Sequence, residues 1–291
     1  MLPKTKKGLT QKTIAYIVLF ALAVTCIIPF WIVLTNATRS NTQISAGVSL
    51  VPGSHFAKNL DTLVNGKINP VTGERGEGWN VFRGLLNSLI LASSTTFLSA
   101  YFSAMTAFGF AFYRFRGGQF LWRIVLAVMM VPTMVGLIGF YKLISGLGMV
   151  DTWWPLILPS IANSFGVFYL RQYYKTSLPM SLIEAMRIDG ASELRIFHRL
   201  GIPMAMPGIA TMSILGFIGN WNSFLLPLVV LNSQSLFPMP VLISRLNPSI
   251  YARDLGAVYL GLAVSIIPIL IIFLIFSRQL VASLGLGSVK E

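Results

Sequence analysis

The chain has 291 residues, of which 55% are hydrophobic and only 11% are charged, and its mean hydropathy is +0.73. Soluble domains carry roughly 25% charged residues, so this composition excludes an ordinary soluble enzyme and indicates a membrane protein. The formal net charge is +13, which in a membrane protein is typical of basic cytoplasmic loops and does not require a nucleic-acid partner. A single cysteine, Cys26, and two histidines, His55 and His198, exclude a disulfide framework and a Cys/His metal site.

Six apolar stretches are long enough to cross a bilayer, which takes about 20 residues in a helix. In chain order they cover 13–35, 85–113, 120–144, 153–170, 204–231 and 255–276. Backbone groups must be paired inside lipid, and these runs do not alternate as barrel strands do, so each is predicted to be a helix. The first run is too long for a signal peptide and lacks a small-residue cleavage site. The expected fold class is therefore all-α, a polytopic membrane protein with six transmembrane helices.

The positive-inside rule predicts the orientation of these helices. Most of the 22 Lys and Arg residues lie inside if the N-terminus is inside, so both termini are expected in the cytoplasm. The chain then divides into a cytoplasmic N-terminus at 1–12, a transmembrane domain at 13–280 and a cytoplasmic tail at 281–291. An external loop is expected at 36–84, and its Gly-rich part is expected to be mobile. A cytoplasmic loop is expected at 172–203.

Prolines interrupt several of the apolar stretches. Because proline removes a backbone hydrogen bond and clashes with the preceding turn, we expect these positions to kink their helices. The prolines concerned are Pro29, Pro132, Pro159, Pro227 and Pro268.

The cytoplasmic loop is longer than a simple link between helices and is itself strongly helical. Ser181 and Glu184 have the spacing of a capping box, so a first helix is predicted to begin there. That helix is predicted to stop at Gly190, which permits a left-handed helix end. A second helix is predicted from Ser192 to just before Gly201. Both are amphipathic, so the pair packs on the membrane surface or on its own bundle, or it docks a soluble subunit.

The segment EAMRIDGASELRIFHRLGIPMAMP, 184–207, resembles the EAA loop of ABC-importer permeases. In that pattern Glu-Ala-Ala is followed by Asp-Gly-Ala and later by two prolines; this chain departs at Met186, normally Ala, and at Ile202, often Leu. The segment GNWNSFLLPLVVL, 219–231, is similar to the fifth-helix signature of carbohydrate-importer permeases. Over nearly its whole length the chain resembles the second, six-span permease subunit of maltose-type importers.

This resemblance implies that the loop is a coupling helix seated in a cleft of a cytoplasmic ABC ATPase dimer. The residues carried over to that docking site are Glu184, Ala185, Met186, Asp189, Gly190, Ala191 and Ser192. It further implies a second, homologous permease subunit, an extracytoplasmic solute-binding protein, membrane lipid and a sugar substrate, in a bacterial inner membrane. No catalytic residue or cofactor is expected in this chain, which has no G-x-x-x-x-G-K-[ST] phosphate loop, so ATP and Mg are expected on the partner ATPase subunits.

Polar and aromatic residues within the apolar stretches are candidates for the substrate pathway, because sugars bind to amides, hydroxyls and aromatic rings. The candidates are Asn163, Tyr169, Ser213, Asn220, Trp221 and Asn222. Hydrogen bonding between helices is the alternative interpretation of such residues. Two other functions stay open at this point, an ABC permease for a polyamine or peptide and a gradient-driven carrier or intramembrane enzyme. The scarcity of acidic residues in the apolar stretches argues against a proton-coupled carrier.

Overall fold

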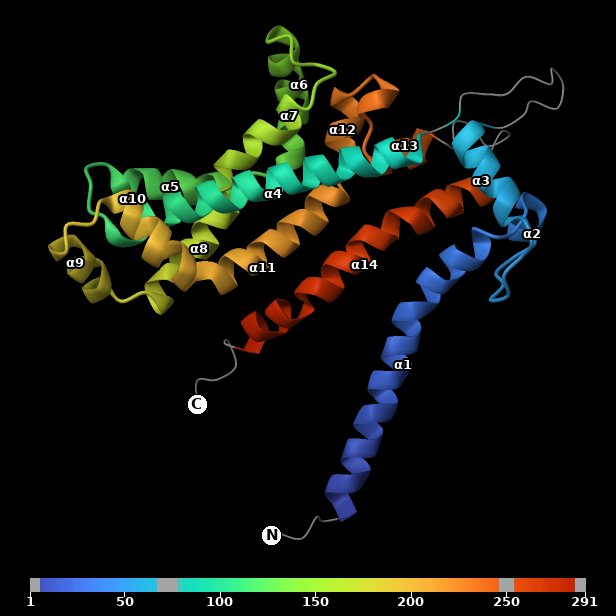
Figure 1. The fold of residues 1–291 in the computed structure, drawn as a ribbon, viewed down its shortest axis with the longest axis horizontal. Coiled ribbons are helices and arrows are strands. Elements are labelled where there is room, and N and C mark those ends of the chain that lie inside the picture. Colours follow the sequence, from blue (N-terminus) through green and yellow to red (C-terminus); the bar gives the residue numbers. More distant parts are fainter. Residues whose placement is uncertain (1–5, 67–77, 79, 246–253, 286–291) are drawn as a thin grey trace. The chain divides into compact units, whose positions relative to one another are not determined.

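The structure, a computed structural model, describes residues 6–66, 78, 80–245 and 254–285. Within these residues the elements are helices joined by loops, and there is no strand (Figure 1). The chain divides into two compact units. The first comprises Met1–Val81 and Ile243–Ile267, and the second comprises Phe82–Leu242 and Pro268–Glu291.

The first unit contains α1 (Lys6–Asn36), α2 (Asn41–Ser45), α3 (Phe56–Asn65) and the first part of α14 (Leu255–Gly285). Leu63 of α3 packs with Ala257 and Leu260 of α14 in a small buried cluster. The buried Asn59 amide donates to the carbonyls of Ala37 and Arg39 at 2.9 and 3.0 Å. The predicted external loop therefore contains two helices, and most of its Gly-rich part, 67–77, lies outside the described residues.

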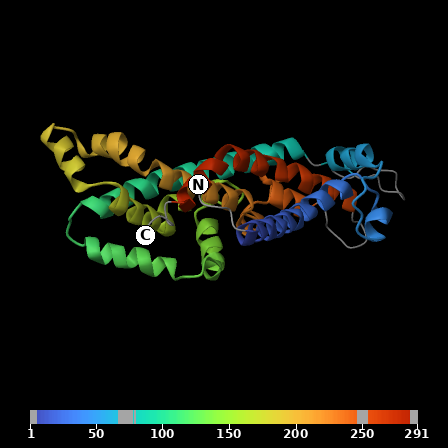
Figure 2. The same cartoon turned by 90° about the horizontal axis from the view of Figure 1, so that it is seen from below.

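The second unit contains most of the helices. They are α4 (Val81–Phe112), α5 (Gly118–Met129), η1 (Thr133–Gly136), α6 (Leu137–Gly146), α7 (Trp154–Ile157), η2 (Leu158–Ala162), α8 (Ser164–Ser177), α9 (Met180–Ile188), α10 (Glu193–Ile196), η3 (Phe197–Gly201), α11 (Ile202–Trp221), α12 (Leu225–Val230), η4 (Gln234–Leu236), the first part of α13 (Met239–Arg245) and the part of α14 from Pro268 onward. The turn from α4 to α5 and the turn around α9 lie at the same end of this unit (Figures 1 and 2).

Small residues allow the helices of the second unit to pack closely. Ala104 and Ala107 of α4 are buried in the main core, which also takes in residues of α8, α9, η3 and α11. A Cβ atom on Gly166 would come within 2.5 Å of the Ser103 hydroxyl, and one on Gly208 within 2.8 Å of the Tyr173 ring. Close approach of helix backbones is how membrane helices gain packing energy without a hydrophobic driving force.

Four helices in the described part of the chain are long and apolar enough to cross a membrane. They cover Lys12–Asn36, Val81–Phe112, Glu193–Trp221 and Leu255–Ile275. They agree with the first, second and sixth predicted stretches, and the third of them contains most of the fifth stretch, 204–231. The prediction of one helix over that fifth stretch is wrong, because α11 ends at Trp221 and a separate short helix, α12, covers Leu225–Val230. The prediction of one continuous helix over 120–144, and of another over 153–170, is wrong, and the count of six spans stays a prediction.

Prolines account for both interruptions. Helix α5 ends at Met129 just before Pro132, and the chain passes through the 3-10 turn η1 before α6 begins. Pro159 lies in the 3-10 turn η2, after which Asn163 is extended and caps α8. Because proline lacks an N–H group and clashes with the preceding turn, a break replaces the expected kink here. Pro29 and Pro268, by contrast, lie inside the uninterrupted helices α1 and α14.

The second loop helix does not end before Gly201, so that prediction is wrong. Helix α10 leads into a π turn, η3, and then directly into α11, with Pro203 in the first turn of α11. A π turn shifts the hydrogen-bond register by one residue, so a proline can be accommodated without ending the helix. Helix α10, the turn η3 and helix α11 therefore form one continuous helix, Glu193–Trp221.

Candidate functional site

Helix α9 lies at the tip of the loop that carries the predicted docking residues. Its N-cap is Pro179 in extended conformation, and no side chain caps it, so the predicted capping box of Ser181 and Glu184 is wrong. With Pro179 as the N-cap, the helix starts two residues earlier than predicted, and Ser181 lies inside its first turn. Ser181 therefore cannot accept a hydrogen bond as an N-cap residue would.

The end of α9 follows the prediction. Gly190 has a φ of +76°, the left-handed region that favours glycine. The N–H of Ala191 donates to the Met186 carbonyl at 3.0 Å, which closes the helix end in the Schellman pattern. Ser192 then takes the N-cap position of α10, as expected, although its side chain makes no capping hydrogen bond. A sharp turn thus joins two helices.

The loop presents one face to the core and another to its surroundings. Ile183 and Ile196 are fully buried, and Met186 and Ala191 pack against the same core. The other residues of the predicted docking site are exposed, namely Glu184, Ala185, Asp189, Gly190 and Ser192. Two large apolar side chains are exposed beside them, Ile188 at 86% and Leu194 at 63%. The loop therefore has an anchored inner face and an exposed outer face that includes apolar side chains.

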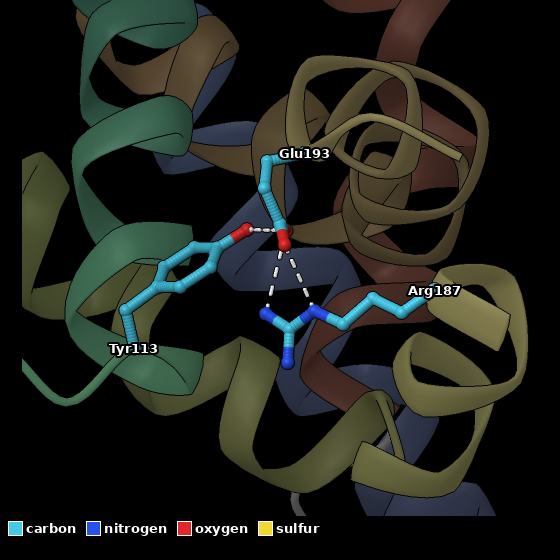
Figure 3. Close-up of polar contacts among 3 residues, drawn as sticks. All are labelled: Tyr113, Arg187 and Glu193. Carbon is cyan, nitrogen blue, oxygen red and sulfur yellow. Dashed lines mark hydrogen bonds and ion pairs between the residues drawn. The ribbon is translucent and has the colours of Figure 1, made fainter. Parts of the chain in front are cut away.

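A three-residue contact, here called the brace, fixes the angle between α9 and α10 (Figure 3). The Nε of Arg187 donates to one Glu193 carboxylate oxygen at 2.9 Å, and its Nη2 donates to the other at 3.3 Å. The hydroxyl of Tyr113, at the end of α4, donates to the same carboxylate. The Arg187 guanidinium also lies over the Tyr113 ring, 5.3 Å from its centroid.

The Tyr113 hydroxyl of the brace is protonated at neutral pH. Burial, followed by the hydrogen bond to Glu193, raises the pKa of Tyr113 from 10.0 to about 12. The phenol therefore stays protonated and remains a donor at neutral pH. Because the Arg187 and Glu193 side chains are 33% and 51% exposed, their ion pair contributes little stability, about 1 kcal/mol or less. The main effect of the brace is on geometry, since it ties the loop to the end of α4.

Sequence reasoning missed the brace. Arg187 lies in the last turn of α9 and Glu193 in the first turn of α10, where their charges suit the helix dipoles. That signal was present in the sequence. No spacing rule, however, links two residues across a glycine turn, or either of them to Tyr113 on another helix.

The sequence-predicted pathway residues fall into separate places. Asn163 and Tyr169 line one cavity of about 240 Å³, where the Tyr169 ring stacks on Phe165 with centroids 6.4 Å apart. The Asn163 amide donates to the Ser99 hydroxyl at 2.8 Å, and its oxygen accepts from the Gly166 N–H at 3.0 Å. The structure therefore brings these two candidates together and ties Asn163 to α4.

The remaining pathway candidates lie on α11 or just after it and face different surroundings. Asn222 lines a cavity of about 800 Å³, and Asn220 lines one of about 80 Å³ and donates to Thr96 at 3.3 Å. Trp221, only 1% exposed, stacks on Phe217 in the core, and Ser213 is half-buried. The consecutive Asn-Trp-Asn residues thus do not form one sugar-binding surface in this structure.

Comparisons with a family model and with known proteins point to the same family. Residues 81–285 match the family described as "Binding-protein-dependent transport system inner membrane component". The chain is 38% identical over 210 residues to the arabinooligosaccharides transport system permease protein AraQ of Bacillus subtilis (strain 168), covering 72% of this chain and 74% of that protein. It is 29% identical over 214 residues to the diacetylchitobiose uptake system permease protein NgcG of Streptomyces coelicolor, covering 72% and 70%.

A solved structure shares the fold. A chain from the crystal structure of a bacterial ABC transporter that imports the acidic polysaccharide alginate aligns with a TM-score of 0.77 at 20% identity. The alignment covers 96% of this chain and 99% of that chain. The helix order described above is therefore that of a known transporter subunit.

Proposed function

The chain belongs to the family of binding-protein-dependent transport system inner membrane components, and we propose that it forms one half of the pathway for a sugar or oligosaccharide in an ATP-driven importer. It is a non-catalytic integral membrane subunit of an ABC importer. The sugar class is supported by its relatives, since the names of two of them specify arabinooligosaccharides and diacetylchitobiose. The family match at 81–285 includes both the loop at α9 and the cavities beside α8 and α11.

The observation that carries this function is the two-sided loop at α9. Its inner face is anchored by Ile183 and Ile196, while Ile188 and Leu194 are exposed. A rigid element with an anchored side and an uncovered apolar side can transmit force from a docked motor. We propose that an ABC ATPase dimer docks there, through Glu184, Ala185, Met186, Asp189, Gly190, Ala191 and Ser192. In this proposal ATP and Mg are bound by that dimer, and this chain holds no cofactor.

The other partners follow from the same proposal. A second, homologous permease subunit completes the pathway, and an extracytoplasmic solute-binding protein delivers the sugar. The family description itself names binding-protein dependence. Both termini lie in the cytoplasm of a bacterial cell, with the loop at α9 on the same side of the inner membrane. The excess of Lys and Arg in the segments assigned to that side supports this orientation.

Within the membrane, we assign the sugar contacts to residues that reach a cavity. Tyr169 offers a hydroxyl and a ring face beside Asn163, and Asn222 offers an amide in the larger cavity. Asn220 lines only the smallest of the three cavities and donates to Thr96, and Ser213 and the buried Trp221 line none of the three, so we assign these residues to packing between helices. Amide and hydroxyl groups with an adjacent aromatic ring suit a neutral polyhydroxylated ligand.

A substitution that removes one charge from the docking loop while keeping the side-chain size tests the proposal. Glu184 is exposed and lines a groove of about 810 Å³ between α9 and the ends of α4 and α8. In the complex reconstituted in liposomes, Glu184→Gln is expected to lower ATP-driven uptake of an arabino-oligosaccharide by about ten-fold or more, as loss of one interfacial charge partner does. The measurement is uptake and ATP hydrolysis side by side, with helix content as a check on folding.

Asp61→Asn is the matched control for this experiment. Asp61 is a carboxylate in α3, within the predicted external loop, and changing it should leave uptake and hydrolysis intact. Unchanged coupling in Glu184→Gln would argue against ATPase docking at the loop. ATP hydrolysis by the wild-type complex with no uptake of any oligosaccharide would overturn the sugar assignment while leaving the family assignment intact.

A further inference from the structure

A cavity at the turn between α4 and α5 is lined by arginines. It has a volume of about 710 Å³, and its basic lining residues are Arg114, Arg123 and Arg171. The other lining residues, all in the described part of the chain, include no acidic side chain. We propose that this cavity binds the phosphate headgroup of an anionic phospholipid, with the acyl chains lying along α5.

The position of the cavity suits a headgroup. Helix α4 is a membrane-length apolar helix that ends at Phe112, and the cavity begins at Phe110 and continues into the first turn of α5. It therefore lies where an apolar span ends, at the depth of the lipid phosphates. Trp122 also lines it, and tryptophan is enriched at that interface.

The arginines of the cavity are oriented or unpaired in ways that favour anion binding. The Arg171 guanidinium carbon lies 4.0 Å from the centroid of the Trp122 ring, and its Nε donates to the Phe110 carbonyl at 3.2 Å. Its plane is thus held in place, while the described residues offer its two terminal nitrogens no hydrogen-bond partner. Arg114 and Arg123 are exposed and have no acidic partner within the described residues. Planar guanidinium groups bind phosphate oxygens in pairs of hydrogen bonds.

Backbone groups add to this preference. Gly117, in the left-handed region at φ +83°, is the N-cap of α5, and Gly118 and Gln119 of its first turn line the cavity. The N-terminus of a helix carries partial positive charge, although the Gly118 N–H itself already donates to the Phe115 carbonyl at 3.1 Å. Side-chain and backbone charges in the cavity therefore favour the same kind of ligand.

The surface next to the cavity decides between a lipid and a soluble anion. Helix α5 has no buried residue, and its side chains Phe120, Leu121 and Ile124 are 65%, 45% and 43% exposed. A charged cavity continuous with an exposed apolar helix matches an amphiphile with a phosphate at one end. Basic pockets between transmembrane helices on the cytoplasmic side bind such headgroups in other membrane proteins.

The test uses a matched pair of exposed arginines close together in the sequence. Arg123, in α5, lines the cavity, whereas Arg116, in the turn just before α5, does not line it, so R123Q and R116Q remove equal charge. The complex is purified from native membranes through a tag on this chain. Native mass spectrometry then measures retention of added phosphatidylglycerol against added phosphatidylcholine.

We expect the wild type and R116Q to retain phosphatidylglycerol preferentially, and R123Q to lose about five-fold in retention, the usual effect of one basic residue near anionic lipid. R114Q is the second variant in case R123Q fails to fold, with thermal stability measured for each. Equal loss in R116Q would show diffuse charge and overturn the proposal. Displacement by excess inorganic phosphate would assign a free anion instead. No preference over phosphatidylcholine in the wild-type complex would likewise overturn the proposal.

Discussion

Tyr113 shows how one side chain can decide the geometry of a loop. It is the only member of the brace outside the loop, and it contributes a hydroxyl donor to the Glu193 carboxylate. A hydrogen bond to a charged acceptor contributes about 1.5 kcal/mol or more when buried, and less at this partly exposed site. The bond holds α10 against the end of α4 and leaves the outer face of α9 free to dock.

We expect Tyr113→Phe to destabilise the purified subunit by about 1 kcal/mol and to loosen the loop. The ring and its packing are retained, so the effect reports the hydroxyl alone. Limited proteolysis should cut faster between α9 and α10, and coupling of ATP hydrolysis to uptake should weaken. Tyr141→Phe, in α6, is the matched control and should change neither measurement. Unchanged proteolysis in Tyr113→Phe would show that the Tyr113 hydroxyl does not restrain the loop.

The brace also predicts an alkaline titration. The pKa of Tyr113 is raised to about 12, so the folded state favours the protonated phenol. Its contribution to stability is fully present below the ordinary tyrosine pKa of 10.0 and is lost as the pH rises toward the folded value. Tyrosinate absorbance of the wild type minus that of Tyr113→Phe should therefore show a transition near pH 12, and a difference transition near pH 10 would contradict the assignment.

At the scale of the element, two isoleucines of α9 differ in burial. Ile183 is fully buried in the core, whereas Ile188, five residues later, is 86% exposed. Because the two side chains are identical, substituting each by alanine separates the role of α9 in core packing from its proposed role in docking. The alternation arises because α9 is amphipathic and rests on the core through one face only.

Ile183→Ala is expected to cost about 2–5 kcal/mol, as truncation of a buried isoleucine does, and to detach α9 from the core. Ile188→Ala should change the free energy of unfolding by less than about 0.5 kcal/mol. It should nevertheless weaken co-purification of the ATPase, because its side chain lies on the proposed docking face. Thermal unfolding and quantitative pulldown measure the two effects. Equal retention of the ATPase by Ile188→Ala and the wild type would contradict docking on that face.

The helices show which local signals were reliable. The turn at Gly190 and the start of α10 after Ser192 were predicted, because a left-handed glycine and an N-cap serine act on their immediate neighbours. The capping box at Ser181 was wrong, since Pro179 takes the N-cap position. The end before Gly201 was also wrong, because α10 continues through the π turn at Phe197–Gly201 into α11.

At the scale of the whole molecule, the orientation in the membrane rests on the distribution of Lys and Arg. In a Cys26→Ser background, which lacks the single native cysteine, new cysteines can report the side of each segment. Thr42→Cys, in the predicted external loop, should react with a membrane-impermeant maleimide on intact spheroplasts. Ser192→Cys and Lys290→Cys should react only after permeabilisation. Labelling of either on intact spheroplasts would reverse the proposed orientation.

The sequence by itself determined the class of this protein. Apolar runs of membrane length, few charges and a basic excess follow from composition, and the family follows from the loop motif, which is continuous in the chain. Both are local properties that need no knowledge of packing. They were sufficient to predict an all-helical transporter subunit and the sharp turn at its loop.

Only the tertiary structure decided how residues distant in sequence meet. The contact of Tyr113 with Glu193, the burial of Trp221 and the arginine cavity at the α4–α5 turn each depend on which helix faces are packed together. The sequence also did not distinguish Pro132, where the helix is broken, from Pro268, which lies inside an uninterrupted helix. The physical reason is that local propensities of a fraction of a kcal/mol per residue compete with core contacts worth several kcal/mol per side chain, and the contacts prevail.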